Sequence, residues 1–334
     1  MNVVLEEEIV GVGLEVREDT AGLIVLKPLR GGPAAEAGVE TGDIILSIDG
    51  RDIRGMKIVS SMDLMKGPSG SQVKIHIARK GANELDFVLT RRIVRVWAVN
   101  DAKILNENHT GYFRLSRFSR SSTAELDQAL NSLHAEGMES LIIDLRGNPG
   151  GLLTSCVGIS DRFVACGIIV STKGRLSTDD TIQAATYAET WSVPVVVLVD
   201  GDSASASEIF AAAIQENKRG LVVGTRSYGK GTVQTHFPLS SIPGDLRLTT
   251  ARFYSPNGRS MSGSGVTPDV EVDDPDGVQH GDEALAEALR LAEGQTLRDM
   301  AKASGLCRPK QSSTSNSTSL EDIVDPKHPG TTVL

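Results

Sequence analysis

The stretch VPVVVLVDGDSASASEIFAAAIQENKRGLVVGTRSYGKGTVQ, residues 193–234, decides the fold of this chain. It opens with the apolar run Val193–Val199, which predicts a fully buried strand. An Ala-rich segment follows, in which Ile209 and Ile214 share one face, and this pattern predicts a helix. A second short apolar run, residues 221–223, leads into a glycine-rich segment. Serines therefore lie where a buried strand turns into a helix, a position that suits a nucleophile and its oxyanion.

The same residues also fit an interpretation without catalysis. Ser205 and Glu208 have the S-x-x-E spacing of a capping box, so Ser205 could simply cap the helix. Lys230 lies between two glycines and could be a solvated turn residue. Ser203 and Ser207 compete with Ser205 for the role of nucleophile, and periodicity does not choose among the three.

The segments DSASASEIFAAAIQ and SYGKGTVQ resemble the active-site pair of the carboxyl-terminal processing proteases, also called tail-specific proteases. The family pattern is S-A-S-A-S-E followed by F-G-K-G-x-x-Q, and only Tyr228 differs, in place of Phe. The resemblance implies that Ser205 is the nucleophile, Lys230 the general base and Gln234 the residue that orients this base. It covers nearly all of residues 9–272.

The DLRGNPGG motif that begins at Asp144 resembles the family's D-L-R-x-N-x-G-G loop. In that loop a glycine offers its N–H to the oxyanion, and both Gly150 and Gly151 match the position. The second donor implied by the resemblance is the N–H of Ala206, directly after the nucleophile. Asp144 and Arg146 are expected to be structural partners within the loop.

The implied chemistry needs a neutral lysine, because a serine hydroxyl becomes nucleophilic only when a base takes its proton. The lysine pKa must then fall from roughly 10.4 toward neutrality, which burial favours. No acidic residue is adjacent to Lys230 in the sequence, and Glu208 would oppose the shift if it pointed inward. Gln234 is neutral and can hold the amine without protonating it. The mechanism requires no histidine, metal or other cofactor, and none is expected.

Residues 9–93 resemble a PDZ module of the bacterial kind. Gly11 and Gly13 interrupt the first strand, so that Gly11, Val12 and Gly13 are expected to direct backbone N–H groups at a peptide carboxylate. The alternative for this tripeptide is a plain β-bulge. The other elements predicted in the module are a helix at Pro33–Ala37, a strand at Ile44–Ile48, a turn at Asp49–Gly50 and a helix at Ile58–Met65.

Alternating strand and helix patterns from 111 to 252 predict an α/β core with a mixed sheet. The family fold is of this kind and is related to crotonase. One amphipathic helix is expected to be capped by Thr123 and to end at Gly137. The predicted domains are a PDZ-like module at 1–93, a Ser/Lys protease core at 94–273, a C-terminal helical segment at 274–303 and a disordered tail at 304–334.

Composition excludes several other classes of protein. The net charge of −9, the pI near 5.3 and an aromatic content of 4% argue against nucleic acid as a partner. Cys156, Cys166 and Cys307 show no metal-binding spacing and are expected to be ordinary thiols. The six histidines form no cluster that predicts a metal site.

The expected function is that of a serine endopeptidase for proteins or peptides with free C-termini, and the alternative is a non-catalytic peptide-binding scaffold. A regulatory partner or homo-oligomer is compatible with either. No signal peptide or membrane span is recognisable in the sequence. The resemblance nevertheless implies an extracytoplasmic, periplasmic or membrane-associated location, so an N-terminally truncated sequence is expected.

Overall fold

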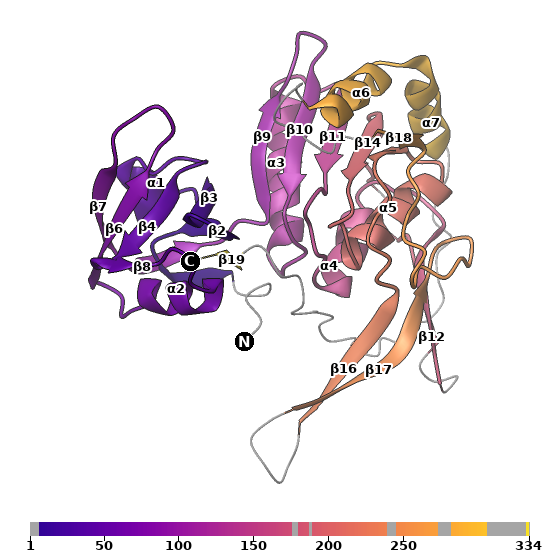
Figure 1. Cartoon of the computed structure of the whole chain (residues 1–334). Coiled ribbons are helices and arrows are strands. Elements are labelled where there is room, and N and C mark those ends of the chain that lie inside the picture. Colours follow the sequence, from indigo (N-terminus) through magenta and orange to yellow (C-terminus); the bar gives the residue numbers. More distant parts are fainter. Residues whose placement is uncertain are drawn as a thin grey trace. The chain divides into compact units, whose positions relative to one another are not determined.

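The computed structural model divides the chain into two compact units, which are drawn in Figure 1. Unit 1 contains Met1–Val96 together with Asp325–Leu334, and unit 2 contains Trp97–Val324. The described residues are 7–175, 180–186, 189–238, 245–272, 282–305 and 332–333.

Unit 1 is built on an antiparallel sheet in the order β19-β2-β3-β4-β6-β7, with β5 paired to β4. A separate antiparallel pair joins β1 to β8. The buried side chains of the sheet, among them Leu14, Val16 and Ile45, form one core. The helices and strands of this unit are β1 (Glu8–Gly11), β2 (Leu14–Asp19), β3 (Gly22–Pro28), α1 (Pro33–Ala37), β4 (Ile44–Ile48), β5 (Arg51–Asp52), α2 (Ile58–Met65), β6 (Gln72–Ala78), β7 (Leu85–Thr90), β8 (Arg92–Arg95) and β19 (Thr332–Val333).

Unit 2 contains two sheets. The larger has the order β18-β15-β14-β11-β10-β9. Adjacent strands in it are parallel, except that β9 pairs antiparallel with β10. The smaller is antiparallel, in the order β13-β12-β17-β16. The strands are β9 (Val99–Ile104), β10 (Thr110–Leu115), β11 (Ser140–Asp144), β12 (Ile168–Gly174), β13 (Thr181–Ala184), β14 (Val195–Val199), β15 (Leu221–Gly224), β16 (Thr232–Pro238), β17 (Asp245–Tyr254) and β18 (Val270–Glu271).

Helices cover both faces of the larger sheet. Alternate strand residues such as Val195 and Val197 pack in one core with α3 (Ser122–Ala135), α4 (Leu153–Ser160) and α5 (Ala206–Glu216). Their neighbours, such as Val196 and Leu198, pack on the other face with α6 (Glu283–Ala292) and α7 (Gln295–Gly305). Because successive strand side chains point to opposite faces, an unbroken apolar run is what a strand covered on both sides requires. The predicted mixed-sheet α/β core is confirmed.

Some local predictions need correction. Helix α3 has Ser121 as its N-cap, so Thr123 lies inside the helix and does not cap it. Cys166 is disulfide-bonded, whereas Cys156 is a buried free thiol, and Cys307 lies outside the described residues. The predicted disordered tail lies largely outside the described residues as well, but Thr332–Val333 within it forms strand β19.

Candidate active site

Ser205 lies at the turn between β14 and α5, where it occupies the N-cap position of the helix. Its φ is 58° and its ψ −113°, a combination that costs a non-glycine residue about 1–3 kcal/mol. The side chain is 2% exposed. A strained serine on a sharp turn from a buried strand into a helix is the geometry that presents a nucleophile at the end of an α/β sheet.

The two competing serines have structural contacts. Ser203 donates its hydroxyl to the carbonyl of Leu145 at 2.8 Å, and Ser207 donates to the carbonyl of Asn148 at 2.9 Å. Both side chains are fully buried. Within the described chain the hydroxyl of Ser205 donates to no acceptor, so Ser205 is the serine of this motif whose proton is not committed to the scaffold.

Glu208 joins the two predicted catalytic segments. Its fully buried carboxylate accepts the backbone N–H of Ser205 and the backbone N–H of Lys230 on the same oxygen, Oε2, each at 2.8 Å. The other oxygen, Oε1, accepts the N–H of Gly229 and the hydroxyl of Ser227, each at 2.6 Å. The predicted nucleophile and base are therefore brought together by one carboxylate. The sequence analysis treated Glu208 as a cap or a threat to the lysine, and its role as a bridge was missed.

Lys230 and Gln234 lie on the segment that leads into and through the start of β16. Lys230 lies two residues before this strand and is partly buried, and Gln234 lies in the strand opposite Thr249 on β17. The neighbouring Gly231 has no space for a side chain, because an added Cβ would lie 2.1 Å from the backbone nitrogen of Ser262. This close approach fixes the backbone beside Lys230.

Replacing Glu208 with glutamine is expected to impair both stability and catalysis. The amide NH2 of glutamine would face N–H and O–H groups that now donate hydrogen bonds to the carboxylate. The free energy of unfolding should therefore fall by about 2–4 kcal/mol. Because the Ser205 and Lys230 backbones would no longer be held together, kcat should fall by roughly 10- to 100-fold. Chemical denaturation and steady-state proteolysis measure the two effects.

The matched control is Glu216→Gln, on the same helix. The Glu216 carboxylate accepts from the backbone N–H of Asn257 and from the side chain of Arg259, which belong to neither catalytic segment. This variant should keep its kcat. A Glu208→Gln protein with unchanged stability and kcat would contradict the bridging role.

The loop that follows β11 lies directly against the Ser205 turn. A Cβ added to Gly150 would come within 2.9 Å of both the Ala206 nitrogen and the Ser205 Cβ. The side chain of the fully buried Asn148 fixes the loop, since its Oδ1 accepts the N–H of Gly150 at 2.8 Å and its Nδ2 donates to the carbonyl of Leu115 at 2.7 Å. Asn148 is a functional candidate that the sequence analysis missed, although the motif contains it.

The two loop glycines differ in how their N–H groups are used. The Gly150 N–H is bonded to Asn148, whereas the Gly151 N–H has no acceptor among the described residues. Phe118 pairs with this segment through the carbonyl of Gly150 and the N–H of Leu152, which leaves the Gly151 N–H out of the pairing. The structure therefore distinguishes the two glycines that the sequence left as alternatives, because the N–H of Gly150 has an acceptor and the N–H of Gly151 has none among the described residues.

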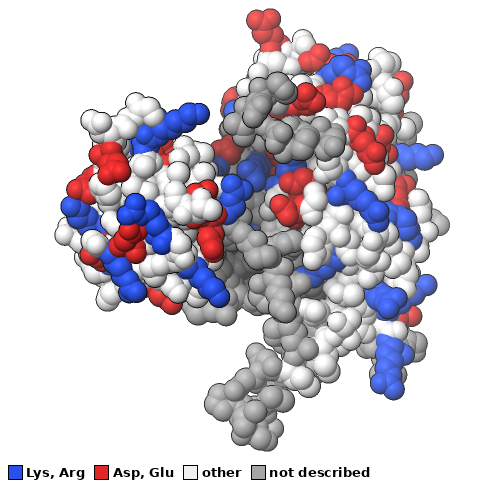
Figure 2. Space-filling model, viewed as in Figure 1, with Lys and Arg blue, Asp and Glu red and all other residues white. Residues whose placement is uncertain are grey.

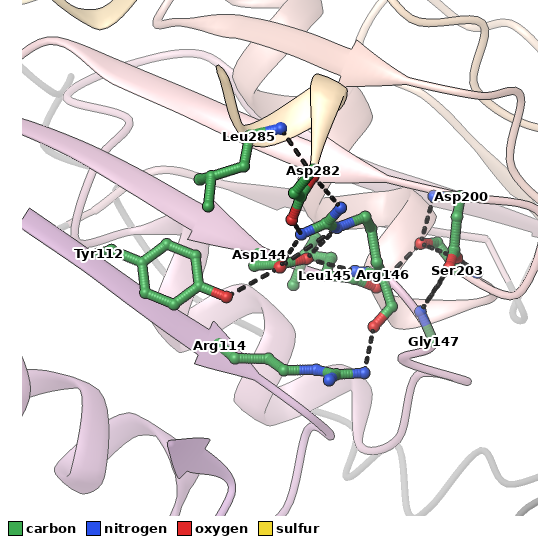
Figure 3. A network of polar contacts seen from close by, with 10 residues as sticks. All are labelled: Tyr112, Arg114, Asp144, Leu145, Arg146, Gly147, Asp200, Ser203, Asp282 and Leu285. Carbon is green, nitrogen blue, oxygen red and sulfur yellow. Dashed lines mark hydrogen bonds and ion pairs between the residues drawn. The ribbon is translucent and has the colours of Figure 1, made fainter. Parts of the chain in front are cut away.

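A polar network at the start of the same loop is drawn in Figure 3. Arg146 pairs with Asp144 at 2.7 Å, as expected, and also with Asp282 at 2.7 Å. Asp282 caps α6 by accepting the N–H of Leu285, and Tyr112 donates its hydroxyl to Asp144 at 2.9 Å.

The environment of the network shifts the pKa of two of its side chains. Burial, and then the charge of Asp144, raise the pKa of Tyr112. Burial acts to raise the pKa of Asp282, but the hydrogen bonds from Arg146 and the Leu285 N–H, together with the charge of Arg146, lower that pKa on balance. The network ties α6 to the loop.

A pocket of about 310 Å³ adjoins this network, with Arg114, Arg146 and Asp200 in its wall. Ser205 and Lys230 are not among its lining residues.

The thiol of Cys156 lies close to the Ser205 turn, with its Sγ 3.1 Å from the carbonyl oxygen of Ala206. Burial raises the pKa of this thiol to about 12. Cys156 is therefore a packing residue and an unreactive thiol.

In unit 1, Val12 and Gly13 connect β1 to β2. These strands belong to different sheets, so the tripeptide is a connection and not a bulge within one ladder. The carbonyl of Val12 accepts from the N–H of Ala34 and the carbonyl of Gly13 accepts from Leu29, each at 2.9 Å. Because the C=O and N–H of a peptide plane point in opposite directions, the Gly13 N–H points away from Ala34. No acceptor for it exists among the described residues.

Charge on the face drawn in Figure 2 is mixed. Lys and Arg side chains are interspersed with Asp and Glu over the described residues of this face. None of the helices in the described part of the chain combines the length and the hydropathy that a bilayer crossing needs.

Comparison with known proteins agrees with this geometry. A PDZ domain model matches residues 24–79, and the model of peptidase family S41 matches residues 109–272. The class is therefore a PDZ module joined to an α/β core of the serine-peptidase type, which confirms the predicted fold class. The chain belongs to peptidase family S41.

Relatives with curated names are carboxyl-terminal processing proteases. The chain is 40% identical over 271 residues to the carboxy-terminal-processing protease of Bartonella bacilliformis, covering 79% of this chain and 62% of that protein. It is 34% identical over 281 residues to the chloroplastic C-terminal processing peptidase of Tetradesmus obliquus, covering 79% and 60%. The solved photosystem II D1 C-terminal processing protease is 33% identical, with a TM-score of 0.52 and coverage of 88% and 79%. The chain thus spans about three fifths of the length of these two curated relatives.

Proposed function

We propose that this chain is a serine endopeptidase in which Ser205 attacks the peptide carbonyl and Lys230 takes its proton. Gln234 orients the lysine. The observation that carries the proposal is the shared carboxylate of Glu208, which holds the Ser205 and Lys230 backbones on one oxygen atom. The capping box that Ser205 forms with Glu208 would also serve a non-catalytic scaffold, but a cap does not require the strained backbone of Ser205 or a hydroxyl that donates to none of the described residues.

The oxyanion site of the proposal consists of the N–H groups of Ala206 and Gly151. The bond between the Gly150 N–H and Asn148 supports Gly151 over Gly150 as the loop donor. Asn148 then acts as a positioning residue, because it holds the loop against the Ser205 turn. Each oxyanion donor is expected to stabilise the tetrahedral intermediate by about 3 kcal/mol.

The reaction would proceed in two steps. The Ser205 oxygen forms a bond to the scissile carbonyl carbon while its proton moves to the Lys230 amine, and that proton then passes to the leaving amine. Water, deprotonated by the same lysine, hydrolyses the acyl-enzyme and restores the serine. These steps use only side chains and water, so the proposal includes no cofactor or metal.

The proposed substrates are proteins or peptides with free C-termini, which the PDZ unit captures. The N–H groups of Val12 and Gly13 would receive the carboxylate, while the peptide adds as a strand to the edge of β2. The orientation of the Val12 carbonyl toward the Ala34 N–H in α1 supports this direction for the Gly13 N–H.

Peptides with a free terminal carboxylate and an apolar last residue should be cleaved faster than the same peptides with an amidated end. Losing charge-assisted hydrogen bonds to the loop should raise KM by about tenfold. Cleavage of several matched acid and amide pairs measures the effect. Equal kcat/KM values for both forms in every pair would contradict carboxylate capture and leave the peptidase proposal in place.

The proposal also includes an extracytoplasmic location, periplasmic or membrane-associated, and leaves room for a regulatory partner or homo-oligomer. The support for the location is the printed name of one relative, which places that protein in the chloroplast and so outside the cytosol. Fractionation of the native cells, with detection of this protein in the cytosol alone, would contradict the location.

A further inference from the structure

The edge of the PDZ sheet carries a strand from the far end of the sequence. Strand β19 (Thr332–Val333) pairs antiparallel with β2, in the register Thr332 with Val16 and Val333 with Glu15. On its other side β2 pairs with β3, so β19 fills the edge that β2 would otherwise leave open. Addition of an extended segment to an exposed sheet edge is a recurring way to bind peptides, because backbone hydrogen bonds supply the affinity.

The direction of this strand matches the direction proposed for a substrate. As residue numbers rise from Thr332 to Val333, their partners on β2 fall from Val16 to Glu15. In that direction along β2, Leu14 and then Gly13 come next, and the Gly13 N–H belongs to the proposed carboxylate loop. A strand running the other way would carry its amino side to this loop.

The sequence of the segment suits a sheet edge. Thr331, Thr332 and Val333 are β-branched, and such residues favour extended backbone. Leu334, next in the sequence, is apolar, and the proposed function expects an apolar last residue in a substrate. The intervening residues from Ser312 to Thr318 are rich in Ser and Thr, a composition typical of a tether.

We propose that the β2 edge binds the chain's own segment around Thr332–Val333 in cis, so that an external peptide must displace it. The competition rests on the proposed function, in which the same edge receives substrate ends, whereas the strand pairing itself does not. A tethered competitor acts at an effective concentration in the millimolar range. When the segment itself has a micromolar intrinsic dissociation constant for this edge, an external peptide should therefore bind the full chain at least about tenfold more weakly than a chain without the segment.

Binding of a labelled hexapeptide tests the competition. The probe has the sequence of residues 329–334, PGTTVL, with a free carboxyl group and an amino-terminal fluorophore. Its affinity is compared for the full chain, a chain that ends at Val324, and the full chain with Thr332→Pro and Val333→Pro, which lacks two strand N–H donors. Both altered chains should bind at least about tenfold more tightly. The control, Ser313→Pro with Thr314→Pro, should bind as the unaltered chain does.

Amide hydrogen exchange at Glu15 and Val16 tests the pairing directly. Protection of the β2 edge should fall in the truncated and Thr332→Pro/Val333→Pro chains and should not depend on protein concentration. Unchanged exchange, or equal peptide affinity in all chains that bind the peptide, would overturn the proposal. Protection that rises with protein concentration would assign the edge to a second copy and overturn binding in cis. If protection depends on the segment but no chain binds the peptide, the cis strand stands and external carboxylate capture fails.

Discussion

Ser205→Ala is expected to lower the rate of casein cleavage by about 10⁴-fold or more, because the acyl-enzyme can no longer form. Ser203→Ala and Ser207→Ala are the controls. Each removes a buried hydroxyl that donates to a backbone carbonyl, so each should cost about 1–3 kcal/mol of stability while turnover remains measurable. Initial rates on casein, with thermal denaturation of each variant, separate the two kinds of effect.

The capping interpretation makes a different forecast for the same variant. If Ser205 serves only the helix, its replacement should cost about 1 kcal/mol of stability and leave the activity of the protein intact. A different result is a Ser205→Ala protein with wild-type rates and an inactive Ser203→Ala or Ser207→Ala protein. That result would show that the nucleophile had been assigned two residues away from its true position. An unaltered chain that cleaves neither casein nor peptides would favour the non-catalytic scaffold.

Lys230→Arg is expected to be as inactive as Lys230→Ala while remaining folded. Guanidinium stays protonated at every accessible pH, so arginine keeps the positive charge but cannot accept the Ser205 proton. The loss should approach that of Ser205→Ala, since nucleophile and base act as a unit. Single-turnover kinetics on a chromogenic ester and circular dichroism of both variants provide the measurement.

Gln234→Ala serves as the graded comparison, because an orienting residue transfers no proton. Its kcat should fall less than that of either Lys230 variant. A fully active Lys230→Arg protein would exclude lysine as the base and would require a different proton acceptor.

Much of the scaffold could be predicted from short-range patterns. The apolar run at Val193–Val199 became β14, which starts two residues later, at Val195, because Pro194 has no N–H to contribute to a ladder. The dipeptide Asp49–Gly50 forms the predicted turn, with φ values of 48° and 77°. The helix at Ile58–Met65 was predicted with its observed bounds. These elements depend on local sequence alone.

Elements that depend on partners far away in sequence were not predictable in this way. Strand β9 lies in what was predicted to be a junction, residues 94–110, because its sequence VNDAKI lacks apolar alternation and none of its residues is buried. Pairing with β10 makes it a strand. At the candidate site, the spacing of Ser205 and Glu208 indicated a local cap, and the structure contains this capping box. The bonds from Glu208 to Gly229 and Lys230 span more than twenty residues and have no sequence pattern of their own.

The bridge at Glu208 has a consequence for how relatives of this fold could lose their chemistry. Three of the four groups that donate to its carboxylate are backbone N–H groups, those of Ser205, Gly229 and Lys230. Backbone donors persist for every side chain except proline, so any other exchange at position 230 leaves this bridge intact. The proposed base can therefore change to another residue type while the architecture around it survives. A pseudoenzyme could arise from this scaffold by a single codon change, and an intact fold with Glu208 in place is no guarantee of hydrolysis.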